Sequence, residues 1–373
     1  MIDPSHLAAT VAWGGFALAF VLGFVASRAN VCAMGAISDV VNMQHWGRMR
    51  TWLLAVAVAI VGASLLHAFG LVDLAKSIFQ RPRLNWLSAL VGGVTFGAGM
   101  TLAGGCANKT LIRIGGGSLR SLVVFAFLGI SAYMTLRGLF GQWRVTFLDP
   151  VSLDLTRFGL KGQDLPTIVA KTTSMDARTA LLVLAALVAG GLFVFIFGDG
   201  RFRQKPDQVA AGILIGLIVT AGWYLTGHLG YAENPDTLEM TFFGTNSHAA
   251  ESLSFVGPIA YTLELLLLWS DKSLGVSFGI ATALGSVAGA LAWALYSKRF
   301  RIEGFANASD TWHHLVGAVL MGFGGVTALG CTFGQGITGV STLSVGSLLT
   351  MGAIVAGAIA TMKYQYWREM RAG

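Results

Sequence analysis

The architecture of this chain follows from Gly330-Cys331-Thr332-Phe333-Gly334-Gln335-Gly336, which continues through Thr338-Gly339 to Ser341-Thr342. This stretch lies between two apolar segments, residues 312–329 and 345–362. Glycine destabilises a helix interior by about 1 kcal/mol relative to alanine, so the stretch is poor material for a spanning helix. Irregular backbone at membrane depth is tolerated only where protein buries it or where it lines a wet cavity. We therefore predict an inward-pointing, re-entrant loop here.

The composition around this stretch is that of a membrane protein. The chain has 373 residues, of which 54% are hydrophobic and 12% charged, and its mean hydropathy is +0.68. A soluble domain carries about twice that charged fraction. The sequence predicts an all-α polytopic membrane protein that forms a single integral-membrane domain over residues 1–373. Asp3 and His6 at the start, without a basic region, indicate a retained first span rather than a cleaved signal peptide.

The net charge of +7 has two interpretations. The first is the ordinary cytoplasmic excess of Lys and Arg in membrane proteins. The second is an electropositive vestibule that concentrates an anion. Because the charges are scattered among the spans, they do not predict a nucleic-acid partner; the lipid bilayer is the predicted surroundings.

The apolar runs predict nine spans, each about 20 residues long to match a bilayer of about 30 Å. They cover residues 7–26, 51–69, 86–103, 120–140, 177–198, 208–229, 273–297, 312–329 and 345–362. The acidic segment 231–250 indicates an external loop and the basic cluster 298–301 a cytoplasmic one. An odd number of crossings must separate them, so the proline-containing segment 253–269 is predicted not to cross. The N-terminus is then outside and the C-terminus cytoplasmic, although Lys76, Arg81 and Arg83 fall outside, against the usual bias. Residues 141–176 are predicted to form an external loop.

A second glycine-rich loop, Gly104-Gly105-Cys106-Ala107-Asn108-Lys109-Thr110, suggests an internal repeat. Cys106 and Cys331 are 225 positions apart, and at this offset four glycines coincide. Gly92, Gly97, Gly99 and Gly105 align with Gly317, Gly322, Gly324 and Gly330. The predicted topology makes the two loops enter from opposite sides, so the repeat is inverted, with halves of about 1–176 and 177–373. Inverted repeats place substrate sites near the bilayer midplane, and we expect Cys106 and Cys331 to approach each other there.

The three cysteines, Cys32, Cys106 and Cys331, are the candidate substrate contacts. An odd count excludes a fully paired disulfide framework, and no CxxC pair or Cys/His cluster indicates a metal site. Small buried hydrophobes, or one disulfide between Cys106 and Cys331, are the structural alternatives. Neutral thiols are weak S–H donors with polarisable surfaces, which suits a soft sulfur-bearing anion. No P-loop is present, and the sequence predicts no cofactor and no catalytic residue.

Residues beside the cysteines supply further candidate contacts. Loop amides and helix N-termini favour anions, and the supporting positions are Gly105, Asn108, Lys109, Gly330, Thr332 and Gln335. Lys109 and Arg113 have the alternative role of marking a cytoplasmic boundary. Glu264 lies in an apolar run and is predicted to be paired or to face a cavity.

Three stretches resemble the YeeE/YedE family of sulfur-compound transporters, whose characterised members take up thiosulfate. They are Asn30-Val31-Cys32-Ala33-Met34-Gly35-Ala36 through Asp39, Ala103-Gly104-Gly105-Cys106 through Leu111-Ile112-Arg113-Ile114-Gly115, and Gly330-Cys331 through Leu343-Ser344. The resemblance implies an hourglass-like helical fold in the inner membrane, with inward-pointing loops. It also implies that Cys32, Cys106 and Cys331 contact the substrate in sequence, and that a small soluble sulfur-carrier protein works on the cytoplasmic side.

The resulting hypothesis is a non-enzymatic importer of thiosulfate or a closely related sulfur anion. The anion meets Cys331 first and passes through S–H···S contacts to Cys106 and Cys32, with no covalent intermediate. Two alternatives stay open. One is a membrane sulfurtransferase that forms a persulfide on Cys106 or Cys331, and the other is a general small-anion channel with structural cysteines.

Overall fold

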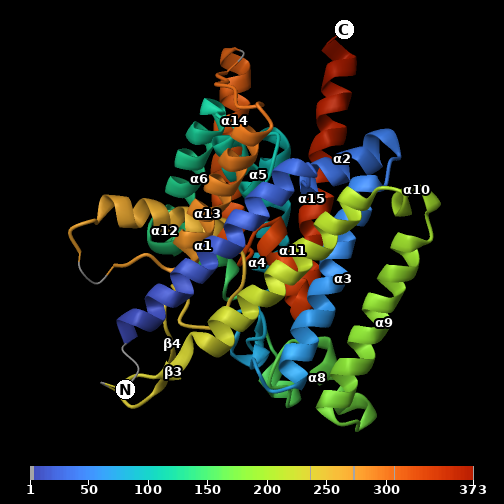
Figure 1. Ribbon diagram of the computed structural model, residues 1–373, viewed down its shortest axis with the longest axis vertical. Helices are drawn as coiled ribbons and strands as arrows, with labels where there is room; N and C mark the ends of the chain where they lie inside the picture. The colour runs from blue at the N-terminus through green and yellow to red at the C-terminus, as the bar shows by residue number, and fades with distance from the viewer. Residues whose placement is uncertain (1–3, 236, 272–273, 306, 373) are drawn as a thin grey trace.

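The computed structural model describes residues 4–372 apart from 236, 272, 273 and 306, and over this part the chain is a bundle of helices (Figure 1). The longer helices are α1 (Pro4–Arg28), α2 (Ala33–Met43), α3 (Gly47–Ala68), α4 (Trp86–Leu102), α5 (Ala107–Gly115), α6 (Leu119–Arg137), α8 (Leu165–Thr173), α9 (Ala177–Phe197), α11 (Pro206–Tyr224), α12 (Val256–Leu267), α13 (Phe278–Tyr296), α14 (Ala308–Thr327) and α15 (Val345–Ala372). Shorter helical pieces are α7 (Leu139–Trp143), α10 (Gly200–Arg203), η1 (Leu74–Lys76), η2 (Arg144–Leu148), η3 (Leu155–Phe158), η4 (Leu225–Leu229), η5 (Gly334–Gly339) and η6 (Val340–Thr342). Two small antiparallel sheets pair β1 (Arg83–Leu84) with β2 (Leu153–Asp154), and β3 (Tyr231–Glu233) with β4 (Met240–Phe242).

Eight helical stretches of the described chain are long and apolar enough to cross a membrane. They are Ser5–Met43, Gly47–Ala68, Trp86–Gly115, Leu119–Arg137, Ala177–Phe197, Pro206–Leu229, Phe278–Tyr296 and Val345–Arg371. They coincide with eight of the nine predicted spans. The ninth, residues 312–329, lies in α14, whose 20 residues include His313 and His314 near the start. α14 is not among the eight stretches of the described chain that are long and apolar enough to cross a membrane. The prediction of an all-α polytopic membrane protein is confirmed.

The segment 253–269 was predicted not to cross the membrane, and it contains the short helix α12. Its 12 residues give a length of about 18 Å at 1.5 Å per residue, which is less than the hydrocarbon thickness of about 30 Å. α12 packs against α6, α13 and α14. The prediction agrees with this length.

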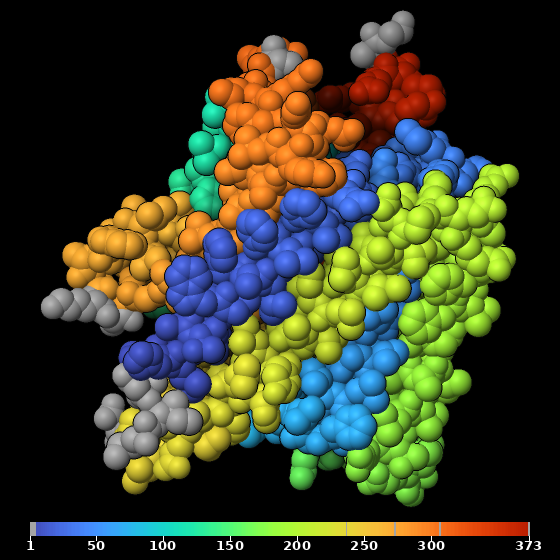
Figure 2. Space-filling view, in the orientation of Figure 1, coloured from blue at the N-terminus to red at the C-terminus, as the bar shows by residue number. Residues whose placement is uncertain are grey.

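Neighbouring helices pack side by side across the face of the molecule that Figure 2 shows. Figure 2 shows α1, α11, α3 and α9 as successive ridges across it. α1 begins at the lower end of the bundle and α15 ends at the upper end (Figure 1). The three cysteines are buried inside the protein, so the outer helices shield the region that carries them.

Residues 141–176, predicted as an external loop, contain the end of α7 together with η2, β2, η3 and α8. Backbone hydrogen bonds also join this segment to the chain at the start of α15. The Val345 N–H donates to the Gln163 carbonyl at 3.0 Å, and the Leu165 N–H donates to the Leu343 carbonyl at 3.0 Å. Backbone groups that are satisfied in this way fix the chain just beyond the Cys331 stretch.

Glycine allows α4 and α14 to touch backbone to backbone. A Cβ atom at Gly99 would lie 2.7 Å from the Gly317 carbonyl oxygen, and one at Gly317 would lie 2.7 Å from the Gly99 oxygen. Gly92 and Gly324 make the same mutual contact, at 2.8 and 2.6 Å. Small residues permit such close approach of membrane helices. At the repeat offset Gly92 corresponds to Gly317, and Gly99 corresponds to Gly324. The Gly92–Gly324 contact is therefore equivalent to the Gly99–Gly317 contact, as expected for two copies related by a two-fold axis. This reciprocity supports the predicted inverted repeat, while the division at 176/177 stays a prediction.

Candidate functional site

Each cysteine follows the same local turn, in which one helix ends and the next begins. Asn30, Gly104 and Leu329 have left-handed backbone angles, with φ of 50°, 65° and 58°, and each lies two residues before a cysteine. Asparagine and glycine adopt this conformation readily, whereas for leucine it costs about 1 kcal/mol or more. Backbone strain of this kind is concentrated at functional sites. The same backbone turn therefore precedes Cys32, Cys106 and Cys331.

Each cysteine precedes a helical turn, and the thiols of Cys32 and Cys331 accept a backbone hydrogen bond from that turn, whereas the Cys106 thiol does not. Cys32 is the N-cap of α2, and its Sγ accepts a hydrogen bond from the Gly35 N–H at 3.5 Å. The Cys331 Sγ accepts from the Gly334 N–H at 3.4 Å, and Cys106 is the N-cap of α5. The N-terminal end of a helix carries a partial positive charge. Each sulfur therefore lies where a neighbouring anion is favoured.

The folded chain brings the three cysteines together. The Cys106 thiol interacts electrostatically with the thiols of Cys32 and Cys331 and has Thr332 beside it, so the three cysteines are neighbours. The exposed fractions are 9% for Cys32, 3% for Cys106 and 0% for Cys331. All three are free thiols, which disagrees with the disulfide alternative. In the described part of the chain, no group of three His, Cys, Asp or Glu side chains is arranged to hold a metal ion.

The stretch that contains Cys331 is buried, as predicted, but it is helical rather than an irregular loop. Residues 334–339 form the π-helical turn η5, and residues 340–342 the 3₁₀ turn η6. The Thr338 hydroxyl donates to the Leu253 carbonyl at 2.7 Å, and Trp223 Nε1 donates to Ser341 Oγ at 3.1 Å. Single π turns occur often at functional sites. Here they let glycine and hydroxyl residues be buried with their backbone groups satisfied.

Cations lie beside Cys32 and Cys106. Lys109 Nζ donates to Asn30 Oδ1 at 2.9 Å, and a Cβ atom at Gly105 would lie 3.1 Å from Lys109 Cγ. Lys109 and Arg113 both act electrostatically on Cys32. Lys109 therefore does more than mark a membrane boundary, because it connects the Cys32 and Cys106 turns. Asn108 is buried, and its Oδ1 has no protein partner.

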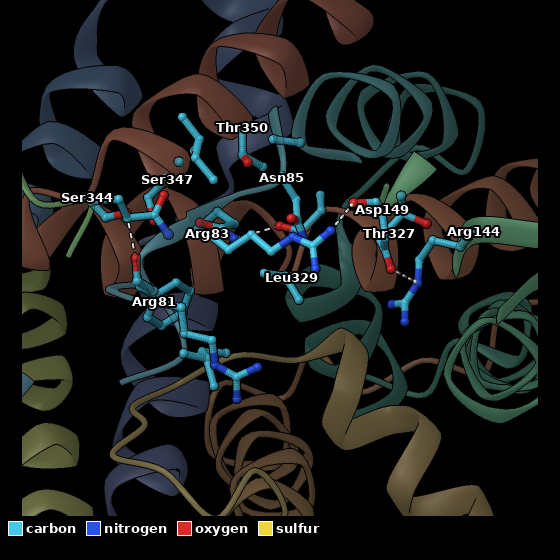
Figure 3. Close-up of a pocket in the computed structure, with 18 of the residues that line it drawn as sticks. Arg81, Arg83, Asn85, Arg144, Asp149, Thr327, Leu329, Ser344, Ser347 and Thr350 are labelled. Atoms are coloured by element: carbon cyan, nitrogen blue, oxygen red, sulfur yellow. Dashed lines mark hydrogen bonds and ion pairs between the residues drawn. The ribbon is translucent and has the colours of Figure 1, made fainter. Parts of the chain in front are cut away.

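A chamber of about 420 Å³, which we call the arginine chamber, lies next to the Cys331 stretch (Figure 3). Arg81, Arg83 and Arg144 line it together with Asp149, and Gln335 reaches it from η5. Arg144 forms an ion pair with Asp149 at 3.3 Å. Arginine is suited to anions because its planar group donates several hydrogen bonds. The chamber can therefore hold a small anion within a few residues of Cys331.

Buried polar atoms without a protein partner gather in the walls of the arginine chamber. The oxygen atoms with no hydrogen bond are Asn85 Oδ1, Gln163 Oε1, Thr327 Oγ1, Gln335 Oε1 and Ser347 Oγ. Buried polar groups are almost always satisfied by protein, water or a ligand. A wet chamber that binds a hydrogen-bonding solute accounts for this concentration of unpaired groups. Sequence reasoning missed all of these residues except Gln335.

The basic residues Arg81 and Arg83 were an exception in the predicted topology, because it placed them on the external side. Both line the arginine chamber. Their predicted departure from the usual bias of basic residues toward the cytoplasm was the signal that could have located the chamber. Lys76, the third of these residues, instead donates to the Tyr231 hydroxyl at 2.6 Å.

A second chamber of about 250 Å³, the glutamate chamber, shares Arg81, Arg144 and Leu329 with the first. Gly330 lines it from the Cys331 stretch, and Glu251 lines it from the loop before α12. Burial raises the pKa of the Glu251 carboxyl from 4.5 to about 7, against a hydrogen bond from Ser247 that lowers it.

Glu264 lies in α12, where it was predicted to be paired or to face a cavity, and both are observed. Its carboxylate is 3.7 Å from Arg137 and accepts from the Tyr133 hydroxyl at 3.4 Å. It also lines a cavity of about 330 Å³ that includes Asn246 and Tyr261, two residues shared with the glutamate chamber.

A family described as sulphur transport matches residues 28–360. The chain is 28% identical over 359 residues to the thiosulfate transporter TsuA of Spirochaeta thermophila, covering 92% of this chain and 96% of that protein. It is 26% identical over 368 residues to the thiosulfate transporter TsuA of Escherichia coli, covering 94% of each. The chain therefore belongs to the sulphur transport family, the YeeE/YedE family that its cysteine stretches resemble, and it is a transporter rather than an enzyme.

Proposed function

We propose that this protein carries thiosulfate, or a closely related sulfur anion, inward across the inner membrane along a path lined by Cys331, Cys106 and Cys32. The observation that carries the proposal is the convergence of three free, buried thiols beside a chamber lined by arginines. Two relatives named as thiosulfate transporters cover nearly the whole chain and support this substrate.

The proposed direction places the arginine chamber outside and Lys109 toward the cytoplasm. The upper end of the bundle, where α2, α10 and the end of α15 lie (Figure 1), carries clusters of basic residues. These include Arg48, Arg50, Arg201, Arg203, Lys298, Arg299, Arg301, Arg368 and Arg371. Since basic residues are in excess on cytoplasmic faces, this end is assigned to the cytoplasm, and the N-terminus lies outside.

Charged side chains, thiols and neutral polar groups line the proposed path. The anion collects among Arg81, Arg83 and Arg144, and its terminal sulfur then meets the thiols through weak S–H···S contacts. Thr332, Gln335 and Asn108 supply oxygen or nitrogen groups near these thiols, and the glycines Gly105 and Gly330 keep the backbone close to the path. Lys109 and Arg113 receive the charge on the far side. No covalent bond to the protein is formed.

Import of a dianion requires an energy source. Each negative charge that moves inward against a negative-inside potential costs about 2.3 kcal/mol per 100 mV. Rapid removal of the imported anion by a small cytoplasmic sulfur-carrier protein would lower the internal concentration of that anion. Further import would then be favoured by mass action. We propose such a partner at the cytoplasmic end.

The function is tested by growth of a transporter-deficient strain on thiosulfate as sulfur source, compared with sulfate or selenite. We expect the wild-type chain to restore growth on thiosulfate, and variants with each cysteine replaced in turn to lose it. Failure of the wild-type chain to restore growth would refute the proposed substrate. A stable persulfide on Cys106 or Cys331, detected by mass spectrometry during turnover, would favour the sulfurtransferase alternative instead.

Replacing Arg81 or Arg144 with glutamine is expected to weaken thiosulfate capture. An ion pair at a partly exposed site contributes up to about 1 kcal/mol, or roughly a fivefold change in affinity. The apparent KM for uptake should rise by about that factor, and the difference from wild type should shrink at high salt because exposed charges are screened. Uptake of radiolabelled thiosulfate at two ionic strengths measures both effects. Arg157→Gln, which removes an exposed charge from η3 without lining either chamber, is the matched control. An equal KM in all three variants would contradict a capturing role.

A further inference from the structure

Glu251 is held rigidly at the wall of the glutamate chamber. Thr226, in η4, fixes its backbone: the Thr226 hydroxyl donates to the Glu251 carbonyl, and the Glu251 N–H donates to Thr226 Oγ1 at 3.2 Å. The carboxylate accepts a hydrogen bond from Ser247 Oγ at 2.8 Å. Gly330 and Leu329 line the same chamber, so Glu251 faces the turn that positions Cys331.

The charged groups around Glu251 come from each wall of the chamber. Arg81 precedes α4, Arg144 begins η2, and Tyr261 extends from α12, with Glu264 one turn beyond it. Arg144 forms an ion pair with Asp149, and Glu264 forms one with Arg137. Within the described residues, no basic side chain forms an ion pair with Glu251. Its carboxyl is therefore the acid in this wall that can change its charge without breaking an ion pair.

We propose that Glu251 is a proton-binding site that couples inward movement of the sulfur anion to inward movement of a proton. The inference rests on the proposed function. Arg81 and Arg144 line both chambers, so the anion and the Glu251 carboxyl share one electrostatic environment. A carboxylate beside a bound dianion is disfavoured by like-charge repulsion, and the anion thus favours the protonated acid. By linkage, the proton favours anion binding equally.

The step involves proton transfer alone. A proton from the outer solution binds a carboxylate oxygen of Glu251, moves inward with the dianion and is released to cytoplasmic water. No other bond forms or breaks, and nothing is oxidised or reduced. The proton offsets part of the charge that must move against the membrane potential. Because burial raises the pKa of Glu251 to about 7, the acid gains and loses its proton within the pH range of the surroundings.

The sign of the pH dependence follows from this pKa. Below it Glu251 is protonated and ready to accept the anion, and above it the carboxylate repels the anion. Thiosulfate uptake by the wild-type protein should therefore fall as the external pH rises through about 7. The fall should be absent in Glu251→Gln, whose side chain stays neutral at every pH.

The decisive experiment measures protons and thiosulfate together in vesicles that contain the full-length protein and an internal pH dye. Adding external thiosulfate to wild type should acidify the interior as labelled thiosulfate enters. In Glu251→Gln the ratio of protons to thiosulfate taken up should fall to zero, whatever rate of thiosulfate entry remains. Glu239→Gln, which changes an exposed carboxylate in the same external segment, should keep the wild-type ratio.

Each outcome of this experiment decides the proposal. Thiosulfate entry without protons in wild type, entry driven by a sodium gradient instead, or an unchanged ratio in Glu251→Gln would overturn it and leave the proposed function intact. Absence of any thiosulfate entry in wild type would refute the proposed function as well. If Glu251→Gln does not fold, Glu251→Asp keeps the carboxyl. It should retain proton uptake with a displaced pH dependence, and a pH dependence identical to wild type would overturn the proposal.

Discussion

Replacing Cys331 with alanine is expected to reduce thiosulfate uptake by about tenfold or more. The Cys331 side chain is completely buried, and its sulfur lies at the start of η5, where Gly334 already donates to it. Removing the thiol leaves a passing anion without a donor at a point that water does not reach. A hydrogen bond to a charged group contributes about 1.5–3 kcal/mol, and the lower end of this range, which suits a weak S–H donor, corresponds to about tenfold. Initial rates of labelled thiosulfate uptake in cells or vesicles measure the effect.

The control for this prediction separates a role in transport from a role in packing. Val124→Ala removes methyl groups at a position of α6 that is only 2% exposed, outside the cysteine turns and both chambers. It should lower the thermal midpoint at least as much as Cys331→Ala while preserving uptake. Undiminished uptake by the double variant Cys331→Ala, Cys106→Ala would instead favour an anion channel whose cysteines are structural.

Much of the architecture could be predicted because membrane spans are encoded locally. Runs such as 177–198 and 208–229 are apolar throughout, and the structure has α9 and α11 there. The cysteine turns were also visible, since glycines before Cys106 and Cys331 disfavour a continuous helix. The boundary of α14 was harder, because His313 and His314 make its start polar although the helix continues through them.

The chambers could not be predicted from local sequence, because distant segments build them. Arg144 lies in η2 and Thr327 at the end of α14, yet both line the arginine chamber. Residues 141–176 have mixed charges and prolines, which favour a loop, but the pairing of β1 with β2 and the contacts to Leu343 and Val345 order them. Tertiary hydrogen bonds override the local preference here. Glu251 was likewise missed, because distant segments bring Arg81, Arg144 and Gly330 into the chamber that it lines.

Replacing Gly97 with alanine is expected to destabilise the protein and to lower the yield of folded material. A Cβ atom at Gly97 would lie 2.2 Å from the Ile354 carbonyl oxygen and 2.8 Å from the Ala358 nitrogen. Both are backbone atoms of α15 and cannot rotate away, so α15 would have to move by roughly 1 Å to restore ordinary contact. Overpacking of a tight interface costs about 1–3 kcal/mol and occasionally more. The yield of monodisperse protein in size-exclusion chromatography, and its thermal midpoint in detergent, measure the loss.

The same substitution at two other glycines shows whether the loss reflects the contact and whether the repeat is real. Gly190 in α9 has no atom within 4 Å of its Cβ direction, so Gly190→Ala should stabilise the helix by up to about 1 kcal/mol. Gly322 is the repeat equivalent of Gly97, and its Cβ would lie 2.5 Å from the Leu128 carbonyl of α6. Thus α4, which precedes Cys106, packs on α15, and α14, which precedes Cys331, packs on α6. In each pair the partner is the long helix that comes after the other cysteine. If the two halves are copies related by a two-fold axis, Gly322→Ala should lower the yield as severely as Gly97→Ala. A Gly322→Ala protein as stable as Gly190→Ala would contradict that relation.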